Sequence, residues 1–415
     1  MQLAEVPLVL VLVGLAAYAV LGGADFGAGI WQLLGRRDER SRAIREHAHH
    51  AMGPVWETNH VWLIFVLVVC WTAYPTAFGS IMSTLAVPLF IAAVGIIMRG
   101  TAYALRSGTA TPREQRIVEV TLALSSILTP FALGAAIGAI ASGRVPVGNA
   151  EGDLIDSWLN ETSILIGTLA VVTAAYMAAV FLAADAVRLG RAELARAFRA
   201  RALAAGVVAG TVAIVGLPVL RDDAPSIWDG LTSGWGLAAV VASVAAGVAT
   251  LALVWARRFE PARYTATIAV ASIIAGWAVA QSPTFLPGLT VSEAAAGRTT
   301  LIATLVSVGI GAAILLPALA LLFGLTLRGR FDHAAREAKR EEASRRLAPN
   351  PLLGRLLPIA LGLLAIGGFF MVVIDAGWAL LIGVPALLGF VATGFVALAS
   401  PEGVLADPIH SPKED

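Results

Sequence analysis

Long apolar runs recur along the whole chain and are separated by short polar segments. They are continuous rather than alternating, and most approach the ~20 residues that a helix needs to cross a bilayer. The runs cover residues 6–34, 55–74, 81–105, 117–141, 163–187, 202–220, 235–255, 264–281, 300–327, 356–373 and 378–398. Only helices and closed barrels satisfy every backbone polar group inside lipid, so helices are expected. The pattern predicts an all-α polytopic membrane protein with about eleven transmembrane helices.

Basic residues gather in every second loop. They follow the first, third, fifth, seventh and ninth runs, whereas the loops on the other side hold only Arg144, Arg221 and Arg298 beside several acids. By the positive-inside rule, the basic loops are expected in the cytoplasm and the N-terminus outside. An odd number of spans then places the C-terminal tail in the cytoplasm.

The chain is expected to contain two four-helix bundles followed by further helices. Tyr18 and Asp25, ahead of one basic loop, resemble Tyr176 and Asp185 ahead of another, which indicates an internal repeat. The expected boundaries are 1–142 for the first bundle, 143–287 for the second, 288–327 for a ninth helix, 328–355 for a charged cytoplasmic linker, 356–399 for a transmembrane hairpin and 400–415 for a cytoplasmic tail.

The composition agrees with a membrane protein and excludes several kinds of site. The 415 residues are 58% hydrophobic and 14% charged, whereas soluble proteins carry about a quarter charged residues. The basic residues are spread over loops, so the net charge of +1 does not indicate nucleic-acid binding. The single cysteine, Cys70, lies inside an apolar run and cannot build a disulfide within the chain, a zinc site or an iron–sulfur site.

An acid lies among glycines in the first run, in the segment GGADFGAG. The simplest interpretation of the glycines is close packing, since small residues let membrane helices approach one another. A carboxylate at this depth must pair with a cation, bind a proton or face water. Asp25 is therefore a candidate for a proton path, and a carboxylate satisfied by a neighbouring helix is the alternative.

The stretch GPVWETNHVWLI places an acid, an amide, an imidazole and two indoles at the start of the second run. A carboxylate partly withdrawn from water can take up and release protons, which makes Glu57 a second candidate. Asn59 and His60 can extend a hydrogen-bonded path from it. An acid favoured by the dipole at a helix start is the alternative for Glu57, and Trp56 and Trp62 can be interface anchors.

Arg99 is the one basic residue expected within a run, near the inner end of the third. An arginine there either extends its head to the interface or pairs with an acid such as Asp25 or Glu57. The sequence leaves both alternatives open.

Histidines are few and poorly placed for a metal. His47, His49 and His50 precede the second run and are interpreted as residues of a solvated loop rather than a metal site. A haem needs an axial ligand that faces a bundle interior, and His60 is the only histidine near a run. We therefore predict that this chain ligates neither haem iron nor another metal.

These segments resemble subunit II of the cytochrome bd-type quinol oxidases. The resemblance is carried by GGADFGAGIW (22–31), GPVWETNHVWLI (53–64), the exit of the third run (99–106), TPFALGAAIGAI (129–140) and AQSPTFLP (280–287). It covers roughly residues 1–330, and the string around Glu57 is its most specific part. Gly22 stands where the family often carries a second acid, which puts any role that needs two carboxylates there in doubt.

The resemblance implies a complex in the bacterial cytoplasmic membrane that oxidises quinol and reduces dioxygen to water. Haems b and d are expected in the partner, subunit I, whereas subunit II is a haem-free scaffold that can hold a quinone. It implies that Glu57 lies on a proton route, that Trp62 is associated with an oxygen path, and that Asp25 and Arg99 line the interior. The hairpin of residues 356–399 lies beyond the family's nine helices, and contact with subunit I, a small extra subunit or lipid is left open.

Two other functions remain open from the sequence. One is a stand-alone proton-coupled secondary transporter that uses Asp25 and Glu57 as coupling acids. The other is a purely structural partner with no role in proton transfer. The apparent repeat starts each half in the same orientation, which excludes an inverted-topology pair but not a parallel one.

Overall fold

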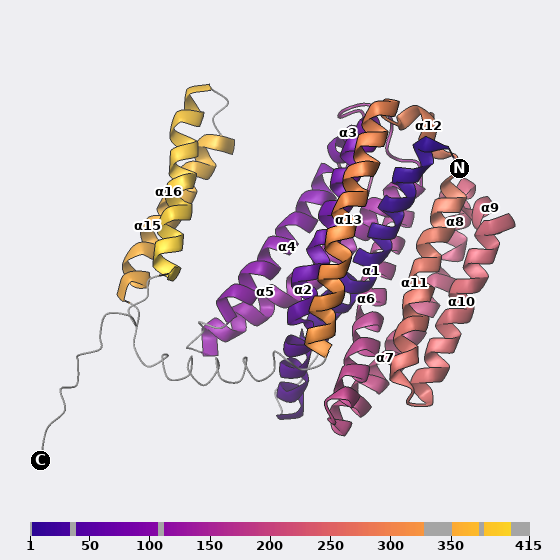
Figure 1. Cartoon of the computed structure of the whole chain (residues 1–415), viewed down its shortest axis with the longest axis horizontal. Helices are drawn as coiled ribbons and strands as arrows, with labels where there is room; N and C mark the ends of the chain where they lie inside the picture. The colour runs from indigo at the N-terminus through magenta and orange to yellow at the C-terminus, as the bar shows by residue number, and fades with distance from the viewer. Residues whose placement is uncertain (1, 34–38, 107–111, 328–350, 373–376, 400–415) are drawn as a thin grey trace, which may run out of the picture. The chain divides into compact units, whose positions relative to one another are not determined.

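The computed structural model describes residues 2–33, 39–106, 112–327, 351–372 and 377–399. Within α2 it leaves out the side chains of residues 39–42 and 49–58. The chain divides into two compact units, Met1–Ile310 and Gly311–Asp415. In both units the regular structure of the described residues is helical apart from one short β-hairpin, which confirms the predicted all-α class (Figure 1).

The first unit holds most of the helices. Its elements are η1 (Leu3–Glu5), α1 (Val6–Leu33), α2 (Glu39–Ala73), α3 (Pro75–Thr84), α4 (Ala86–Arg106), α5 (Pro112–Ala141), α6 (Glu161–Arg188), α7 (Ala192–Val215), α8 (Leu217–Asp223), α9 (Pro225–Leu231), α10 (Gly234–Trp255), α11 (Phe259–Gln281), β1 (Thr284–Leu286), β2 (Leu289–Thr290) and α12 (Val291–Ala294). The helix α13 (Arg298–Leu327) begins in this unit.

Among the described residues, eight helices are long and apolar enough to cross a membrane. Three shorter apolar helices, Asn59–Ala73, Pro358–Phe370 and Leu381–Thr393, coincide with the second, tenth and eleventh predicted runs. Every predicted run therefore overlaps an apolar helix. The number of runs that cross the membrane stays a prediction.

The helix α2 begins far earlier than the apolar run that marks it. It starts at Glu39 and continues to Ala73, so His47 lies on a helix and is buried, at 1% exposure. The interpretation of this segment as a solvated loop is wrong for His47, while the side chains of His49 and His50 lie outside the described residues. Ile44 and Ala48 are buried on the same helix, and their spacing is the helical signal within an otherwise polar segment.

Two further differences concern breaks in the helices. The third run is interrupted at Leu85, where α3 ends and α4 begins. Beyond α11, residues 284–290 form an antiparallel hairpin, with Thr284 opposite Thr290 and Leu286 opposite Leu289. Proline residues flank β1 on both sides, which explains why the apolar segment there does not continue as a helix.

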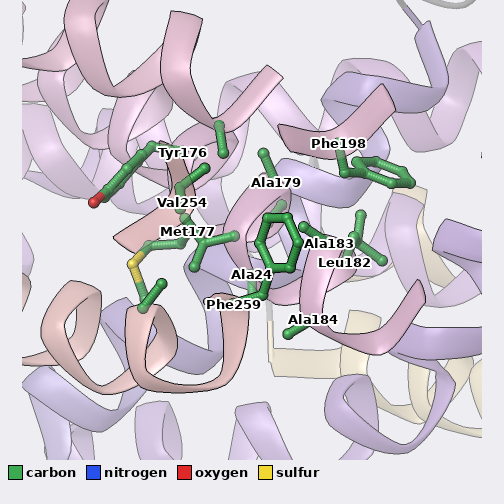
Figure 2. Packing of buried hydrophobic residues seen from close by; sticks show 14 of the residues in the cluster. Ala24, Tyr176, Met177, Ala179, Leu182, Ala183, Ala184, Phe198, Val254 and Phe259 are labelled. Carbon is green, nitrogen blue, oxygen red and sulfur yellow. The ribbon is translucent and has the colours of Figure 1, made fainter. Parts of the chain in front are cut away.

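The main core of the first unit lies where α1 and α6 meet α7, α10 and α11. Ala24 of α1 packs with Met177, Ala179 and Ala183 of α6, and Phe198 of α7 closes one side (Figure 2). Most of these side chains are small, so the helix axes approach closely. The two helices that carry the apparent repeat, α1 and α6, are thus direct neighbours.

We call one end of this helical unit the N-terminal end, because residues 2–5 lie there. It also contains the loops formed by residues 142–160 and 282–297. The Tyr74 hydroxyl donates to the Ala4 carbonyl at 2.6 Å, and the Ala296 N–H donates to the Ala73 carbonyl at 2.8 Å. These two hydrogen bonds connect the segments around Ala4 and Ala296 to the C-terminus of α2.

A bidentate ion pair closes the same end. Both terminal nitrogens of Arg144 donate to the Asp223 carboxylate, and the Thr162 hydroxyl donates to it at 2.6 Å. The hydrogen bond to Asp223 raises the pKa of Arg144 above its ordinary value. These contacts join the loop after α5, the start of α6 and the end of α8.

The second unit contains a helical hairpin. Its helices are α15 (Pro351–Val372) and α16 (Leu380–Ala399). The short η2 (Gly377–Ala379) lies between them and leads directly into α16. Gly367 of α15 faces Leu387 of α16, where an added Cβ would lie 2.7 Å from the Leu387 side chain. The predicted hairpin is therefore packed closely. The charged linker and the C-terminal tail lie outside the described residues, apart from the start of α15.

Candidate functional site

Asp25 of α1 and Arg99 of α4 form a fully buried ion pair. Both side chains have 0% exposure. Arg99 Nε donates to Asp25 Oδ2 at 2.9 Å, and Arg99 Nη2 donates to Asp25 Oδ1 at 2.6 Å. Of the two alternatives for Arg99, the structure shows pairing with Asp25, 74 positions away in sequence.

The remaining polar atoms of this ion pair are also satisfied. Arg99 Nη1 donates to the Ser126 hydroxyl at 2.7 Å, and the Tyr103 hydroxyl donates to Asp25 Oδ1 at 3.3 Å. The Phe26 and Tyr103 rings lie 4.9 and 5.3 Å from the guanidinium carbon. Such complete bonding offsets the large cost of burying two charges.

Glycines of α1 provide the space that these polar groups occupy. An added Cβ at Gly29 would lie 2.0 Å from Ser126 Oγ and 3.2 Å from Arg99 Nη1. At Gly22 it would lie 2.9 Å from both amide atoms of Asn59. The packing interpretation of the glycine segment therefore covers only part of its role, because Gly22 and Gly29 also make room for polar side chains.

Asn59 of α2 and Tyr18 of α1 place further polar atoms on this side of α1. Asn59 is fully buried, and neither its amide nitrogen nor its oxygen has a hydrogen-bond partner among the described residues. The Tyr18 hydroxyl is likewise buried without such a partner in the described part of the chain. A buried polar atom left unbonded costs about 1–3 kcal/mol, so these positions are suited to water or to a mobile proton carrier.

These side chains gather along one face of α1. Tyr18, Gly22, Asp25 and Gly29 are spaced by three or four residues and therefore share one face of α1. We call Tyr18, Asn59, Asp25, Arg99 and Ser126 the polar track. It combines a fixed ion pair with uncommitted hydrogen-bonding groups.

The other predicted residues all lie on α2. His60 is half-buried next to Asn59 in sequence. Glu57 lies within the helix, 18 residues beyond its start at Glu39, so its interpretation as a helix-start acid is wrong. The side chains of Glu57 and Trp56 lie outside the described residues, and their contacts with the polar track stay a prediction.

Trp62 is half-buried beside an apolar cluster. It packs with Tyr18, Phe26 and Ala174, and its ring meets Phe65 edge-on at 6.3 Å between centroids. This tryptophan therefore packs toward the interior next to the polar track. The side chains of this cluster are apolar apart from the Tyr18 hydroxyl.

A second polar contact lies at the opposite, arginine-rich end of this unit, which we define by the turns at residues 188–191 and 256–258. His47 Nε2 lies 3.1 Å from the Leu182 carbonyl oxygen and 3.8 Å from Asp185 Oδ2. Asp185 in turn accepts two hydrogen bonds from Arg188. Sequence reasoning missed this link between α2 and α6 because the polar segment around His47 was taken for a loop.

The contacts of Ser126 and Tyr103 with the ion pair were also not predicted. Tyr103 follows Arg99 by four residues, so the helical spacing of α4 was a usable signal. No local pattern links Ser126 to either residue. Among the described residues, no three His, Cys, Asp or Glu side chains gather where they could hold a metal ion.

Comparisons with known proteins identify the family of the chain. The chain matches the family model described as cytochrome bd terminal oxidase subunit II over residues 3–326. It is 26% identical over 127 residues to cytochrome bd ubiquinol oxidase subunit 2 of Bacillus subtilis, which covers 30% of this chain and 36% of the relative. It is also 26% identical over 130 residues to cytochrome bd-I ubiquinol oxidase subunit 2 of Escherichia coli K12, covering 31% of this chain and 33% of that protein. These alignments span about a third of each curated relative.

A solved structure extends the likeness to most of the fold. A chain of the bd oxidase from Geobacillus thermodenitrificans aligns with a TM-score of 0.61 and 25% identity, covering 79% of this chain and 99% of the other. The match of the family model includes the polar track and all the helices that surround it. The chain therefore belongs to the cytochrome bd terminal oxidase subunit II family.

Proposed function

We propose that the chain is the haem-free subunit II of a bd-type terminal oxidase, a complex that oxidises quinol and reduces dioxygen to water. Membership of the family and the names of the relatives support this assignment. The observation that carries the proton-transfer part is the polar track, in which the Asn59 amide has no hydrogen-bond partner among the described residues and Asp25 and Arg99 form a buried ion pair.

In this proposal the redox centres belong to a partner. Haems b and d, bound in subunit I, supply electron transfer and dioxygen chemistry there. The buried His47 already contacts the Leu182 carbonyl and Asp185, which supports a structural use of this histidine. A small extra subunit, quinone and lipid are further proposed partners.

Protons are proposed to move past Glu57, Asn59 and His60. Asp25 lies beside this route, held in place by its hydrogen bonds to the Arg99 guanidinium. Trp62, in apolar surroundings, is proposed to line a route for dioxygen. The polar and apolar routes then lie side by side along the same helix, α2.

The chain is a multi-pass bacterial membrane protein, and its orientation is part of the proposal. The arginine-rich end faces the cytoplasm, so the N-terminus lies outside and the C-terminal tail inside. The two four-helix bundles with the boundaries given above remain the proposed organisation. In this organisation α1 is the first helix of one bundle and α6 is the first helix of the other, and these two helices pack against each other.

A cavity of about 380 Å³ is the proposed place for a quinone ring in this subunit. It lies at the N-terminal end and is lined by residues of α5, α9, α11 and the hairpin, among them Ser142, Gln281 and Thr284. Its size falls within the usual range for small-molecule sites. Gln281 Oε1 is buried with no hydrogen-bond partner among the described residues, and the Gln281→Leu variant should retain less quinone after purification.

Isolation in mild detergent tests the assignment directly. An oxidase complex should co-purify with a haem-bearing polypeptide and absorb in the Soret region. A colourless preparation of this chain alone, active in proton-coupled transport, would favour the transporter alternative instead.

The Glu57→Gln variant tests the proposed proton route. We expect lower quinol oxidase turnover and an altered pH profile, with the haem spectrum intact. Glu46→Gln removes an exposed acid from the same helix and serves as the control, which should leave turnover unchanged. An unchanged pH profile in Glu57→Gln would support a purely structural role.

A further inference from the structure

The helix α10 carries an exposed apolar face with a tryptophan at each end. Trp235 is 82% and Trp255 is 69% exposed. The two positions are 20 residues apart, which corresponds to about 30 Å along a helix and equals the thickness of the bilayer hydrocarbon core. Figure 1 shows α10 at the edge of the first unit, and Val241, Val244 and Val248 lie exposed between the tryptophans. Since tryptophan favours membrane interfaces, Trp255 marks the interface at the arginine-rich end.

Two exposed arginines follow Trp255 after one intervening residue. Arg257 and Arg258 are exposed, and neither forms an ion pair with any described residue. The nearest acid in sequence, Glu260, is paired with Arg263. Positive charge is therefore uncompensated just beyond the interface, at the level of lipid phosphates.

Arg257 holds this position in an unfavourable backbone conformation. Its φ of 60° lies in the left-handed region, and among the described non-glycine residues only Ala150 shares this property. The turn after α6 has the same hydrogen-bond pattern but carries Gly190 at the equivalent position, with φ 69°. Glycine adopts this conformation without strain, so an arginine here points to a use for its side chain.

Arg199 of α7 fixes the neighbouring tryptophan. Its Nε donates to the Val254 carbonyl at 3.1 Å, and its Nη2 donates to the Trp255 carbonyl at 2.9 Å. Its guanidinium carbon lies 5.0 Å from the Trp255 ring centroid. The end of α10 is thus anchored, and the turn that carries Arg257 and Arg258 starts from a fixed point.

We propose that this turn binds the headgroup of an anionic phospholipid. The Arg257 and Arg258 guanidinium groups bind the phosphate, which suits their paired donors, and the acyl chains lie along the valine face of α10. The occupant is a phospholipid of the surrounding bilayer, because its phosphate is opposite in charge to the two arginines and its acyl chains match the apolar face of α10. The inference requires only that the chain spans a membrane, so it stands or falls independently of the proposed oxidase activity.

The test uses the full chain, isolated in mild detergent with any subunit that co-purifies and placed in phosphatidylcholine nanodiscs with or without phosphatidylglycerol. Native mass spectrometry counts the retained phosphatidylglycerol, and thermal unfolding reports the stabilisation that it provides. Arg257→Gly should weaken retention roughly tenfold, as expected for the loss of one strong contact, and should reduce the stabilisation. In phosphatidylcholine alone it should unfold at the same or a higher temperature, because glycine relieves the strained turn.

Two further variants separate the binding site from general charge effects. Arg257→Lys keeps the charge and should retain most of the lipid. Arg298→Ala removes one exposed arginine at the other end of the unit and should leave retention unchanged. Retention by Arg257→Gly equal to that of the wild type would overturn the proposal. An equal stabilisation by inorganic phosphate alone would also overturn it, since the site would then bind phosphate rather than lipid.

Discussion

Gly27 of α1 and Ala174 of α6 meet with no space for a side chain between them. An added Cβ at Gly27 would lie 1.9 Å from the Ala174 carbonyl oxygen and 2.4 Å from its carbonyl carbon. Because both are backbone atoms, the clash cannot be relieved by a rotamer change. The distance between these helices is therefore set by the absence of a Cβ at this position.

Replacing Gly27 by alanine should destabilise the chain. The helices must separate to admit the methyl group, and such overpacking costs about 1–3 kcal/mol or more. Thermal unfolding in detergent should show the loss. Gly23→Ala is the control, because its added Cβ would have no neighbour closer than 3.7 Å, and we expect it to be neutral or slightly stabilising. Equal effects of the two variants would contradict the packing argument.

Breaking the Asp25–Arg99 pair should be among the most costly substitutions in the first unit. Arg99→Met leaves the Asp25 carboxylate buried without its cation, which costs about 3–5 kcal/mol. In Asp25→Asn/Arg99→Met the buried charges are removed together, so a substantial part of that loss should return. Unfolding of the two single variants and the double variant measures the coupling.

An exposed ion pair provides the comparison. Arg196 and Glu193 pair within α7, with side chains 61% and 74% exposed, and removing such a pair costs at most about 1 kcal/mol. If Arg99→Met were no more damaging than Arg196→Met, the buried pair would not be an important structural contact.

The Arg144–Asp223 pair should stabilise the N-terminal end of the first unit. Arg144→Ala removes the bidentate contact and leaves Asp223 with Thr162 as its remaining side-chain partner. We expect a loss of about 1–3 kcal/mol, as for hydrogen bonds to charged groups. Hydrogen exchange should increase at the start of α6 and in α8. Increased exchange confined to the loop that contains Arg144 would contradict the proposed link.

Asp153 should make the loop before α6 sensitive to acid. Its Oδ1 accepts hydrogen bonds from the backbone N–H groups of Asp156 and Ile155, both at 2.7 Å, and these bonds lower the pKa of Asp153. A lowered folded-state pKa gives stability that is present above the unfolded-state pKa. That stability is lost as pH falls through the folded-state pKa.

Hydrogen-exchange protection of these two amides, corrected for the intrinsic rate, should therefore fall in acid. Asp153→Ala lacks the acceptor at every pH, so its protection should be low and nearly independent of pH. Protection in the wild type that does not change with acid would show that the carboxylate is dispensable for the turn.

The apolar runs predicted most of the helices because lipid solvation leaves long apolar segments few alternatives. The start of α2 was missed for the opposite reason: its polar residues resemble a loop, and among the side chains described there Ile44 and Ala48 are the buried apolar ones. Hydropathy also does not report helix breaks, so the interruption at Leu85 was not predicted.

The candidate site was predicted in part. The sequence placed Asp25 and Arg99 within apolar runs, but it could not choose between an Arg99 that extends to the interface and one that pairs with Asp25 or Glu57, because such pairing depends on packing between distant helices. That the Asn59 amide has no hydrogen-bond partner within the described part of the chain is likewise a property of tertiary structure, since it depends on what surrounds the side chain. The spacing of Tyr18, Gly22 and Asp25 was visible in the sequence. The structure adds that Asn59 of α2 lies against this face of α1, next to Gly22.

The length of α2 has a mechanical consequence. Its 35 residues extend about 52 Å, about 20 Å more than the hydrocarbon core, and only Asn59–Ala73 is strongly apolar. The polar half therefore stands outside the hydrocarbon as an unbroken extension of the buried half. A displacement at His47, by whatever docks on that extension, is expected to be transmitted along the helix toward Asn59, with Gly53-Pro54 as the position between them where the helix can bend.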